Sequence, residues 1–177
     1  MLVFAMSACG TEGKDINNDP NAGSAQEQYD KLLERPSFED ATEQYKELVA
    51  EVQRITVEVG GIPPKGTAVG GAACEFDFPG LGQDAGTRRI NGGVPKAAIP
   101  DDAWPKVVAQ VAEVGKRYGF ERQQVFKDQP GNHQVRFFDS YGIDFSLSTE
   151  VDTSMSVSTA CHFGDAARQR GAPADAG

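Results

Sequence analysis

The sequence of 177 residues is poor in histidine, tryptophan and cysteine, with two, one and three copies. It also lacks the uninterrupted apolar run of about 18 residues that a bilayer-spanning helix needs. Basic residues are scarce, since 17 Lys and Arg stand against 26 Asp and Glu and leave a formal charge of −9. Nucleic acid and anionic lipid headgroups are both bound through basic clusters, so we expect the chain to bind neither by charge.

Recognisable catalytic motifs are absent as well. His133 and His162 are the only histidines, and no G-x-S-x-G elbow accompanies them, so a Ser–His–Asp triad is not predicted. The glycine-rich stretches have neither the G-x-G-x-x-G spacing nor a following Lys-Ser/Thr, which argues against a nucleotide site. We expect no catalytic centre, no cofactor and no metal.

What the chain does contain begins with the segment MLVFAMSAC at residues 1–9. An apolar stretch and two small residues precede Cys9, which is the pattern of a lipoprotein signal peptide whose cysteine is acylated. We interpret residues 1–9 as the remnant of such a signal and Cys9 as the lipidation site, carrying palmitate-like chains into the bilayer. Because no positively charged segment precedes the apolar stretch, we expect either that the true start codon lies upstream or that the sequence is truncated at its N-terminus.

The remaining boundaries follow from composition. Residues 10–35 are rich in Gly, Asn and Asp in their first half and predict a flexible spacer. Residues 164–177 end in GAPADAG and predict a disordered tail. A single α/β domain is then expected over residues 36–163.

Two amphipathic helices are predicted in this domain. The first begins at Ser37 as N-cap and ends at Gly60-Gly61. The second is capped by Asp101 or Asp102 and ends at Gly119. Apolar residues recur in both at steps of three and four. In order, they are Phe38, Ala41, Tyr45, Leu48, Val52, Ile55 and Val59, then Trp104, Val107, Val108, Val111, Val114 and Tyr118.

Alternation of apolar and polar residues predicts five strands. The first covers residues 72–78 and is followed by a long loop over residues 79–100. The other four form an antiparallel meander from residue 120 to residue 161, and the last two have one apolar and one serine-rich face. We therefore predict an α+β fold of order α-β-α-β-β-β-β, a two-layer sandwich with two helices on one face of a mostly antiparallel five-stranded sheet.

The other two cysteines, Cys74 and Cys161, fall in the inward register of their predicted strands. An exported chain meets an oxidising compartment, so we favour a disulfide between them. Two free buried thiols are the alternative. A zinc site with His133 and His162 is disfavoured because the usual C-x₂₋₄-C spacing is missing.

Five residues are candidates for partner binding. Phe126 and Phe138 lie in the register of the hairpin opposite to the core, and Tyr141 is close to them in sequence. Together they would form an exposed apolar patch of the kind that marks interaction sites. Arg88 and Arg89 lie on the predicted long loop, where they could hold an anionic group.

The M-S-A-C motif, the helix R-P-S-F-E-D-A-T-E-Q-Y-K-E-L-V and the final T-A-C-H-F resemble the LppA-type lipoproteins of mycobacteria and related actinobacteria. The resemblance extends from Cys9 to about Phe163. It implies an envelope lipoprotein with a mixed α/β domain and no established enzymatic activity.

We therefore expect a lipoprotein anchored at the extracytoplasmic face of the cell membrane, which binds or scaffolds an unknown protein or small envelope ligand. An envelope hydrolase acting on cell-wall or lipid substrates is the alternative. It requires a deep pocket in which His133 or His162 lies beside a carboxylate and a hydroxyl.

Overall fold

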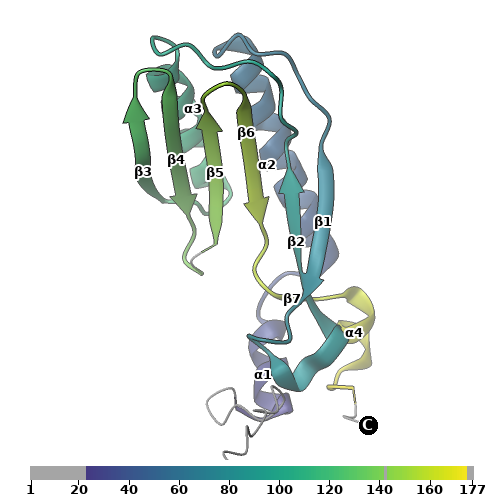
Figure 1. Ribbon diagram of the computed structural model, residues 1–177. Coiled ribbons are helices and arrows are strands. Elements are labelled where there is room, and N and C mark those ends of the chain that lie inside the picture. The colour runs from purple at the N-terminus through teal and green to yellow at the C-terminus, as the bar shows by residue number, and fades with distance from the viewer. Residues whose placement is uncertain (1–22, 142, 175–177) are drawn as a thin grey trace, which may run out of the picture.

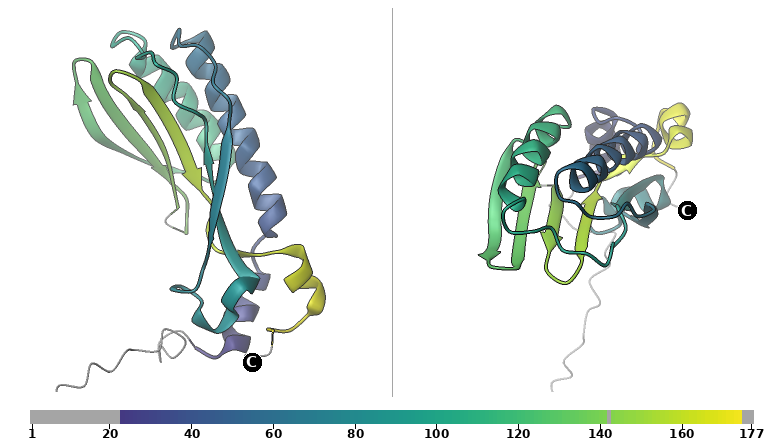
Figure 2. Two further views of the ribbon diagram at one scale, coloured as in Figure 1. Left: turned by 45° about the vertical axis from the view of Figure 1, so that its right-hand side comes forward. Right: turned by 90° about the horizontal axis from the view of Figure 1, so that it is seen from above.

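A computed structural model describes residues 23–141 and 143–174. Its architecture is mixed α+β: two long helices cover one face of an antiparallel sheet, and two shorter helices lie at one end of that sheet (Figures 1 and 2). Six strands follow one another in the order β1-β2-β6-β5-β4-β3, and the short β7 pairs with β2. The α+β class is thus confirmed, whereas the described sheet has seven strands instead of the five predicted.

The α-helices are α1 (Ala25–Leu33), α2 (Phe38–Glu58), α3 (Trp104–Arg117) and α4 (Asp165–Arg170), and η2 (Pro79–Asp84) is a 3₁₀ segment. The strands are β1 (Ala68–Ala73), β2 (Ala85–Asn91), β3 (Arg122–Gln129), β4 (Asn132–Phe138), β5 (Asp144–Thr149), β6 (Thr153–Ser158) and β7 (His162–Phe163).

The two long helices form where the apolar periodicity predicted them. Ser37 caps α2 by accepting a hydrogen bond from the Asp40 amide at 3.1 Å, and Leu48 and Val52 are fully buried against the sheet. The predicted cap of α3 is wrong, because its N-cap is Ala103 and no side chain caps it. The carboxylate of Asp101 turns instead toward the β3–β4 turn and accepts a hydrogen bond from the amide of Gly131.

The strands β3 to β6 form the predicted antiparallel meander. Along β4, β5 and β6 every second residue is buried, because one face of the sheet lies under the helices. These inward side chains meet those of α2 and α3 in the main hydrophobic core. From the three strands they are Val135, Phe137, Phe145, Leu147, Met155 and Val157.

Two predictions for residues 72–100 are wrong. The strand there is β1, which ends at Ala73, and Phe76, which falls within the predicted strand, is 86% exposed in the turn that follows. The predicted long loop contains β2, which pairs with β1, β6 and β7. Its sequence AGTRRIN buries only two side chains, Ala85 and Ile90, so it carries no strong alternation that would reveal a strand.

The predicted spacer and tail also contain ordered helices. Helix α1 lies within the predicted spacer and begins with a capping box formed by Ser24 and Glu27. Helix α4 lies within the predicted tail, and its Ala167 is buried. The buried hydroxyl of Tyr29 in α1 donates a hydrogen bond of 2.8 Å to the carbonyl of Ala167, so these two segments support each other. Both predictions are wrong over these helices, and residues 10–22 lie outside the described part.

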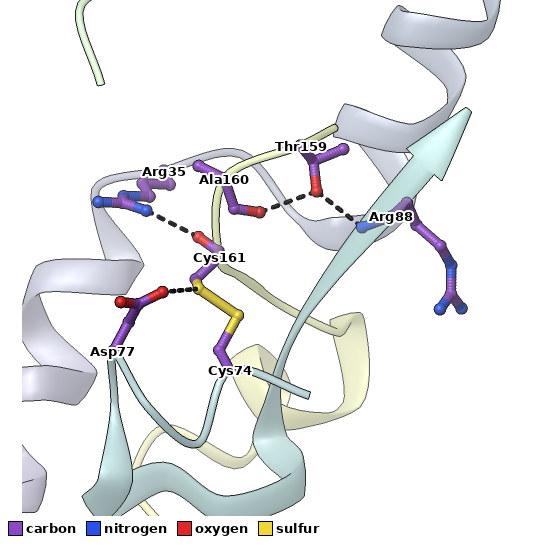
Figure 3. Close-up of a disulfide and its surroundings, with 7 residues drawn as sticks. All are labelled: Arg35, Cys74, Asp77, Arg88, Thr159, Ala160 and Cys161. Atoms are coloured by element: carbon purple, nitrogen blue, oxygen red, sulfur yellow. Dashed lines mark hydrogen bonds between the residues drawn. A yellow bond between two sulfur atoms is a disulfide. The ribbon is translucent and has the colours of Figure 1, made fainter. Parts of the chain in front are cut away.

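The disulfide between Cys74 and Cys161 is present, with 6.0 Å between the two Cα atoms (Figure 3). It lies in a second, smaller hydrophobic cluster built from α1, η2, β7 and α4. The guanidinium of Arg35 donates a hydrogen bond of 2.9 Å to the carbonyl of Cys161. The bond therefore joins the segment after β1 to the segment before β7, and the free-thiol and zinc alternatives are wrong.

Removing the disulfide with the double substitution Cys74→Ala and Cys161→Ala should destabilise the fold strongly. The bond closes a loop with a sequence separation of 87 residues. On the chain-entropy model a loop of this length contributes about 4–5 kcal/mol to the free energy of unfolding. Urea unfolding of the variant and of the wild type, each with and without dithiothreitol, measures the loss. A wild-type transition that does not respond to reductant would contradict the bond.

The contact between α1 and α4 is tested by Tyr29→Phe. The substitution keeps the buried ring but leaves the carbonyl of Ala167 without its hydrogen bond, so the free energy of unfolding should fall by about 1 kcal/mol. Tyr141→Phe is the matched control, since Tyr141 is 63% exposed. If both variants unfold at the wild-type urea concentration, residues 25–33 do not pack as described.

Candidate functional site

The face of the sheet that points away from α2 and α3 is the candidate site. Figure 2 shows both helices on the other side of the sheet, and within the described residues no helix crosses this face. We call it the open face. It is formed by Arg89 and Asn91 of β2, Arg122, Gln124, Phe126 and Lys127 of β3, Gln134, Arg136 and Phe138 of β4, Asp144, Ser146 and Ser148 of β5, and Ser154, Ser156 and Ser158 of β6.

Two of the predicted residues, Phe126 and Phe138, lie on the open face, and each carries an arginine over its ring. The guanidinium carbon of Arg136 lies 4.6 Å from the centre of the Phe126 ring, and that of Arg122 lies 5.3 Å from the centre of Phe138. A cation over an aromatic face is attracted by the ring quadrupole. Phe126 occupies the irregularity between Val125 and Lys127 in the β3–β4 pairing, which lets it join the outward side chains.

The two central strands, β5 and β6, present only short polar side chains on the open face, beside the arginines and phenylalanines of β3 and β4. The hydroxyls of Ser146 and Ser156 lie 3.2 Å apart, and those of Ser148 and Ser154 lie 3.0 Å apart. Each hydroxyl has one donor and two acceptor positions, so a serine pair keeps hydrogen-bonding capacity toward solvent. The sequence showed the serine-rich face but gave no reason to name single serines as site residues.

The pair Arg88-Arg89 is split by the strand that carries it. Arg89 reaches the open face and donates to the hydroxyl of Ser156 at 3.3 Å. Arg88 points to the helix side, where its guanidinium carbon lies 3.8 Å from the centre of the Phe38 ring. A Cβ on Gly71 would lie 2.6 Å from the backbone carbonyl oxygen of Thr87, as well as 2.4 Å from Nη1 of Arg88, so glycine is needed there. The expectation that both arginines share a loop is therefore wrong.

Arg88 borders a hollow of about 470 Å³ between the start of α2, the strands β1 and β2, and α4. Its polar lining includes Arg170, which is paired with Asp84, and Glu39, whose carboxylate accepts from the amide of Asp165. Acidic and basic groups balance here, so the hollow selects for neither sign of ligand charge.

Tyr141, the remaining candidate, lies after β4 and away from the outward strand positions. Its ring carries the guanidinium of Arg35 at 4.9 Å, next to the disulfide cluster. The same guanidinium lies 5.7 Å from the ring centre of Phe78. Tyr141 therefore contacts the segment between α1 and α2, whereas Phe126 and Phe138 belong to the open face.

His133 is buried between two carboxylates at the top of the β3–β4 hairpin. Its Nε2 lies 2.9 Å from Oδ1 of Asp101, and its Nδ1 lies 2.9 Å from Oδ1 of Asp128. The ring stacks on Trp104 with 5.1 Å between the centres. These contacts join the start of α3 to the hairpin. Nothing in the sequence indicated that either aspartate pairs with His133. Asp101 is 32 residues away in sequence, and Asp128 lies on the other side of the β3–β4 turn.

His162 is also buried, and its Nδ1 donates to the carbonyl of Pro36 at 3.0 Å. Burial lowers the pKa of His162 below its ordinary value, and the nearby Arg35 and Arg168 lower it further. Neither histidine has a serine hydroxyl among its hydrogen-bond partners within residues 23–141 and 143–174. The arrangement required for the predicted alternative, a hydrolase, is thus not found in this part of the chain.

A second hollow of about 370 Å³ lies between α3 and β3, at the free edge of the sheet. Its lining includes Trp104, Val108 and Val125, and the last is 56% exposed. The bulge after Val125 and the neighbouring Lys127 interrupt the regular edge, which disfavours the addition of another strand.

Two further features concern the described residues only. They contain no cluster of three His, Cys, Asp or Glu side chains that could hold a metal ion. None of their helices combines the length and the apolar character required to cross a membrane. Cys9, the predicted lipidation site, lies outside the described residues.

Comparison with known proteins identifies relatives of this fold. The family model LppA, described as a lipoprotein confined to pathogenic Mycobacterium, matches residues 13–165. The crystal structure of the lipoprotein LppA from Mycobacterium tuberculosis is similar with a TM-score of 0.59 and 16% identity, over 80% of this chain and 86% of that one. A DUF4853 family protein from Actinomyces odontolyticus has a TM-score of 0.47 and 17% identity, over 76% and 73% of the two chains. No curated protein matches the chain.

The His133 cluster should make stability depend on pH through Asp101. Hydrogen bonds from His133 and from the amide of Gly131 hold the pKa of Asp101 below its ordinary value. A carboxylate with a lowered folded-state pKa stabilises the fold above its unfolded-state pKa, and the contribution is lost as the pH falls through the folded-state pKa. Asp101→Asn should therefore lower the urea midpoint at pH 7, and the difference from wild type should shrink below about pH 4.

Asp102→Asn is the matched control, because it removes the same charge from the adjacent exposed position. Its urea midpoint should stay close to that of the wild type at both pH values. Equal midpoints for the two variants at pH 7 would contradict the role of Asp101.

Proposed function

Because the chain belongs to the LppA family of lipoproteins, we propose that it is a cell-envelope lipoprotein held at the extracytoplasmic face of the membrane by acyl chains on Cys9. The family match over residues 13–165 is the observation that carries this proposal, since it begins shortly after the M-S-A-C motif. The chain would then meet the bilayer through lipid, with a folded domain outside it.

The strength of such a tether is consistent with a domain that needs no other membrane contact. Each buried methylene contributes about 0.8 kcal/mol, so one acyl chain holds a protein only marginally and two or more hold it stably. The net charge of −9 would oppose electrostatic docking on an anionic leaflet.

The domain itself acts, in this proposal, as a binding module without catalytic activity. Its two histidines serve as structural contacts: His133 joins α3 to the hairpin, and His162 bonds to the backbone at Pro36. The open face instead presents arginines and two phenylalanines, which are residue types enriched at interfaces, beside a row of serines. An envelope hydrolase has no comparable support.

Replacing Cys9 tests the anchor. The gene is expressed in an actinobacterial host, and the peptide that contains Cys9 is analysed by mass spectrometry. We expect two or three acyl chains on Cys9 in the wild type and none in Cys9→Ser, because serine offers no thiol for the lipid transfer. Detergent-phase partitioning of the wild type should accompany the modification.

Ser7→Ala is the control, since it keeps a small residue before an unchanged Cys9. This variant should be acylated like the wild type. A wild-type protein with an unmodified cysteine at position 9 would overturn the proposed anchoring.

A further inference from the structure

Positive charge is concentrated on the open face of an otherwise acidic chain. Its strands carry four cations, Arg89, Arg122, Lys127 and Arg136, and one acid, Asp144. On the opposite side of the molecule, α2 alone contains six acidic and two basic residues. An anionic ligand would therefore be repelled by the helix layer and attracted by the open face.

The cations on this face retain free hydrogen-bonding capacity. Arg136 forms an ion pair with Asp144 in which Nη1 lies 3.7 Å from the carboxylate, too far for a hydrogen bond, so this contact does not use up the N–H donors of the guanidinium. The cation–π contacts with Phe126 and Phe138 restrain the guanidinium groups of Arg136 and Arg122. A restrained guanidinium loses less conformational entropy when it binds a carboxylate or phosphate in its plane.

The serines between these cations supply a second kind of recognition. Outward side chains recur about every 7 Å along a strand and about every 5 Å across neighbouring strands. The pairs Ser146–Ser156 and Ser148–Ser154 thus present a regular set of donors and acceptors that suits a ligand with many hydroxyl groups. The exposed ring of Phe126 adds an apolar surface on which the C–H face of a sugar can pack.

We propose that the open face binds an anionic polysaccharide of the cell envelope, with arginines on its charged groups and serines on its hydroxyls. The proposal rests on the proposed function, because an envelope location is what brings this face to such polymers. A lipid headgroup layer would use the cations but has no use for the serine pairs, and an acidic protein would have to match the same regular hydroxyl pattern.

Binding is measured with the detergent-solubilised full chain on immobilised polygalacturonate, a polysaccharide with one carboxylate per sugar. Arg89→Gln, Arg122→Gln and Arg136→Gln should each weaken binding about threefold, and the triple variant roughly twentyfold. Added salt should weaken wild-type binding as well. Arg54→Gln is the matched control, since Arg54 is an exposed arginine on α2 that pairs with Glu58, and it should bind like the wild type.

A second pair of variants separates hydroxyl recognition from charge. Ser146→Thr keeps the hydroxyl. Ser146→Val introduces a side chain of nearly the same shape as threonine but without a hydroxyl. Ser146 is paired in register with Arg136. Binding should be retained by the threonine variant and weakened by the valine variant. The thermal unfolding midpoint of every variant should match that of the wild type, which excludes misfolding as the cause.

Three results would overturn the proposal. The first is wild-type affinity in the triple arginine variant, and the second is equal binding of the Ser146→Thr and Ser146→Val variants. The third is equal affinity for polygalacturonate, polyglutamate and vesicles of anionic lipid, which would mean attraction by charge alone. Cys9 acylation is read separately, so failure of polysaccharide binding and failure of anchoring are distinguishable.

Discussion

Successive side chains of a strand point to opposite faces, and this period of two organises the whole molecule. In β4, β5 and β6 it sends valine, leucine and phenylalanine under α2 and α3 and sends serine and arginine outward. The two long helices cover only one face, so the same alternation that builds the core also composes the open face (Figure 1). A register shift by one residue would exchange these faces, which is why burial on one side specifies the chemistry of the other.

The stability of the end of the sheet at β7 depends on a different set of contacts. There the strand β7 has two residues, and the apolar cluster around it is small. The disulfide, the hydrogen bond from Tyr29 to the carbonyl of Ala167 and the tilted aromatic contact between Tyr29 and Phe163 join segments that are distant in sequence. A cluster with little apolar area needs such cross-links, because burial alone contributes too little to offset chain entropy.

These two regions differ in how far the sequence revealed them. Helices α2 and α3 and the meander from β3 to β6 were predictable because each repeats an apolar pattern over many residues. Strand β2 was missed because its own side chains do not alternate between apolar and polar. It is a strand because it pairs with β1, β6 and β7. Helices α1 and α4 were missed because polar residues surround the few that are buried. At the site, Phe126, Phe138 and Arg89 were named, whereas Arg122 and Arg136 were not, since single arginines in a strand carry no signal of partnership.

The sequence by itself determined the secondary structure of the long periodic segments and the division of the last strands into an apolar and a serine-rich face, because local spacing suffices for these properties. It favoured the disulfide between Cys74 and Cys161 over free thiols, and the structure decided in favour of the disulfide. Only the tertiary structure decided that Arg88 and Arg89 point to opposite sides, that His133 lies between Asp101 and Asp128, and that four cations gather on one face. Those relations depend on which strands become neighbours, and strand pairing is a property of the whole chain.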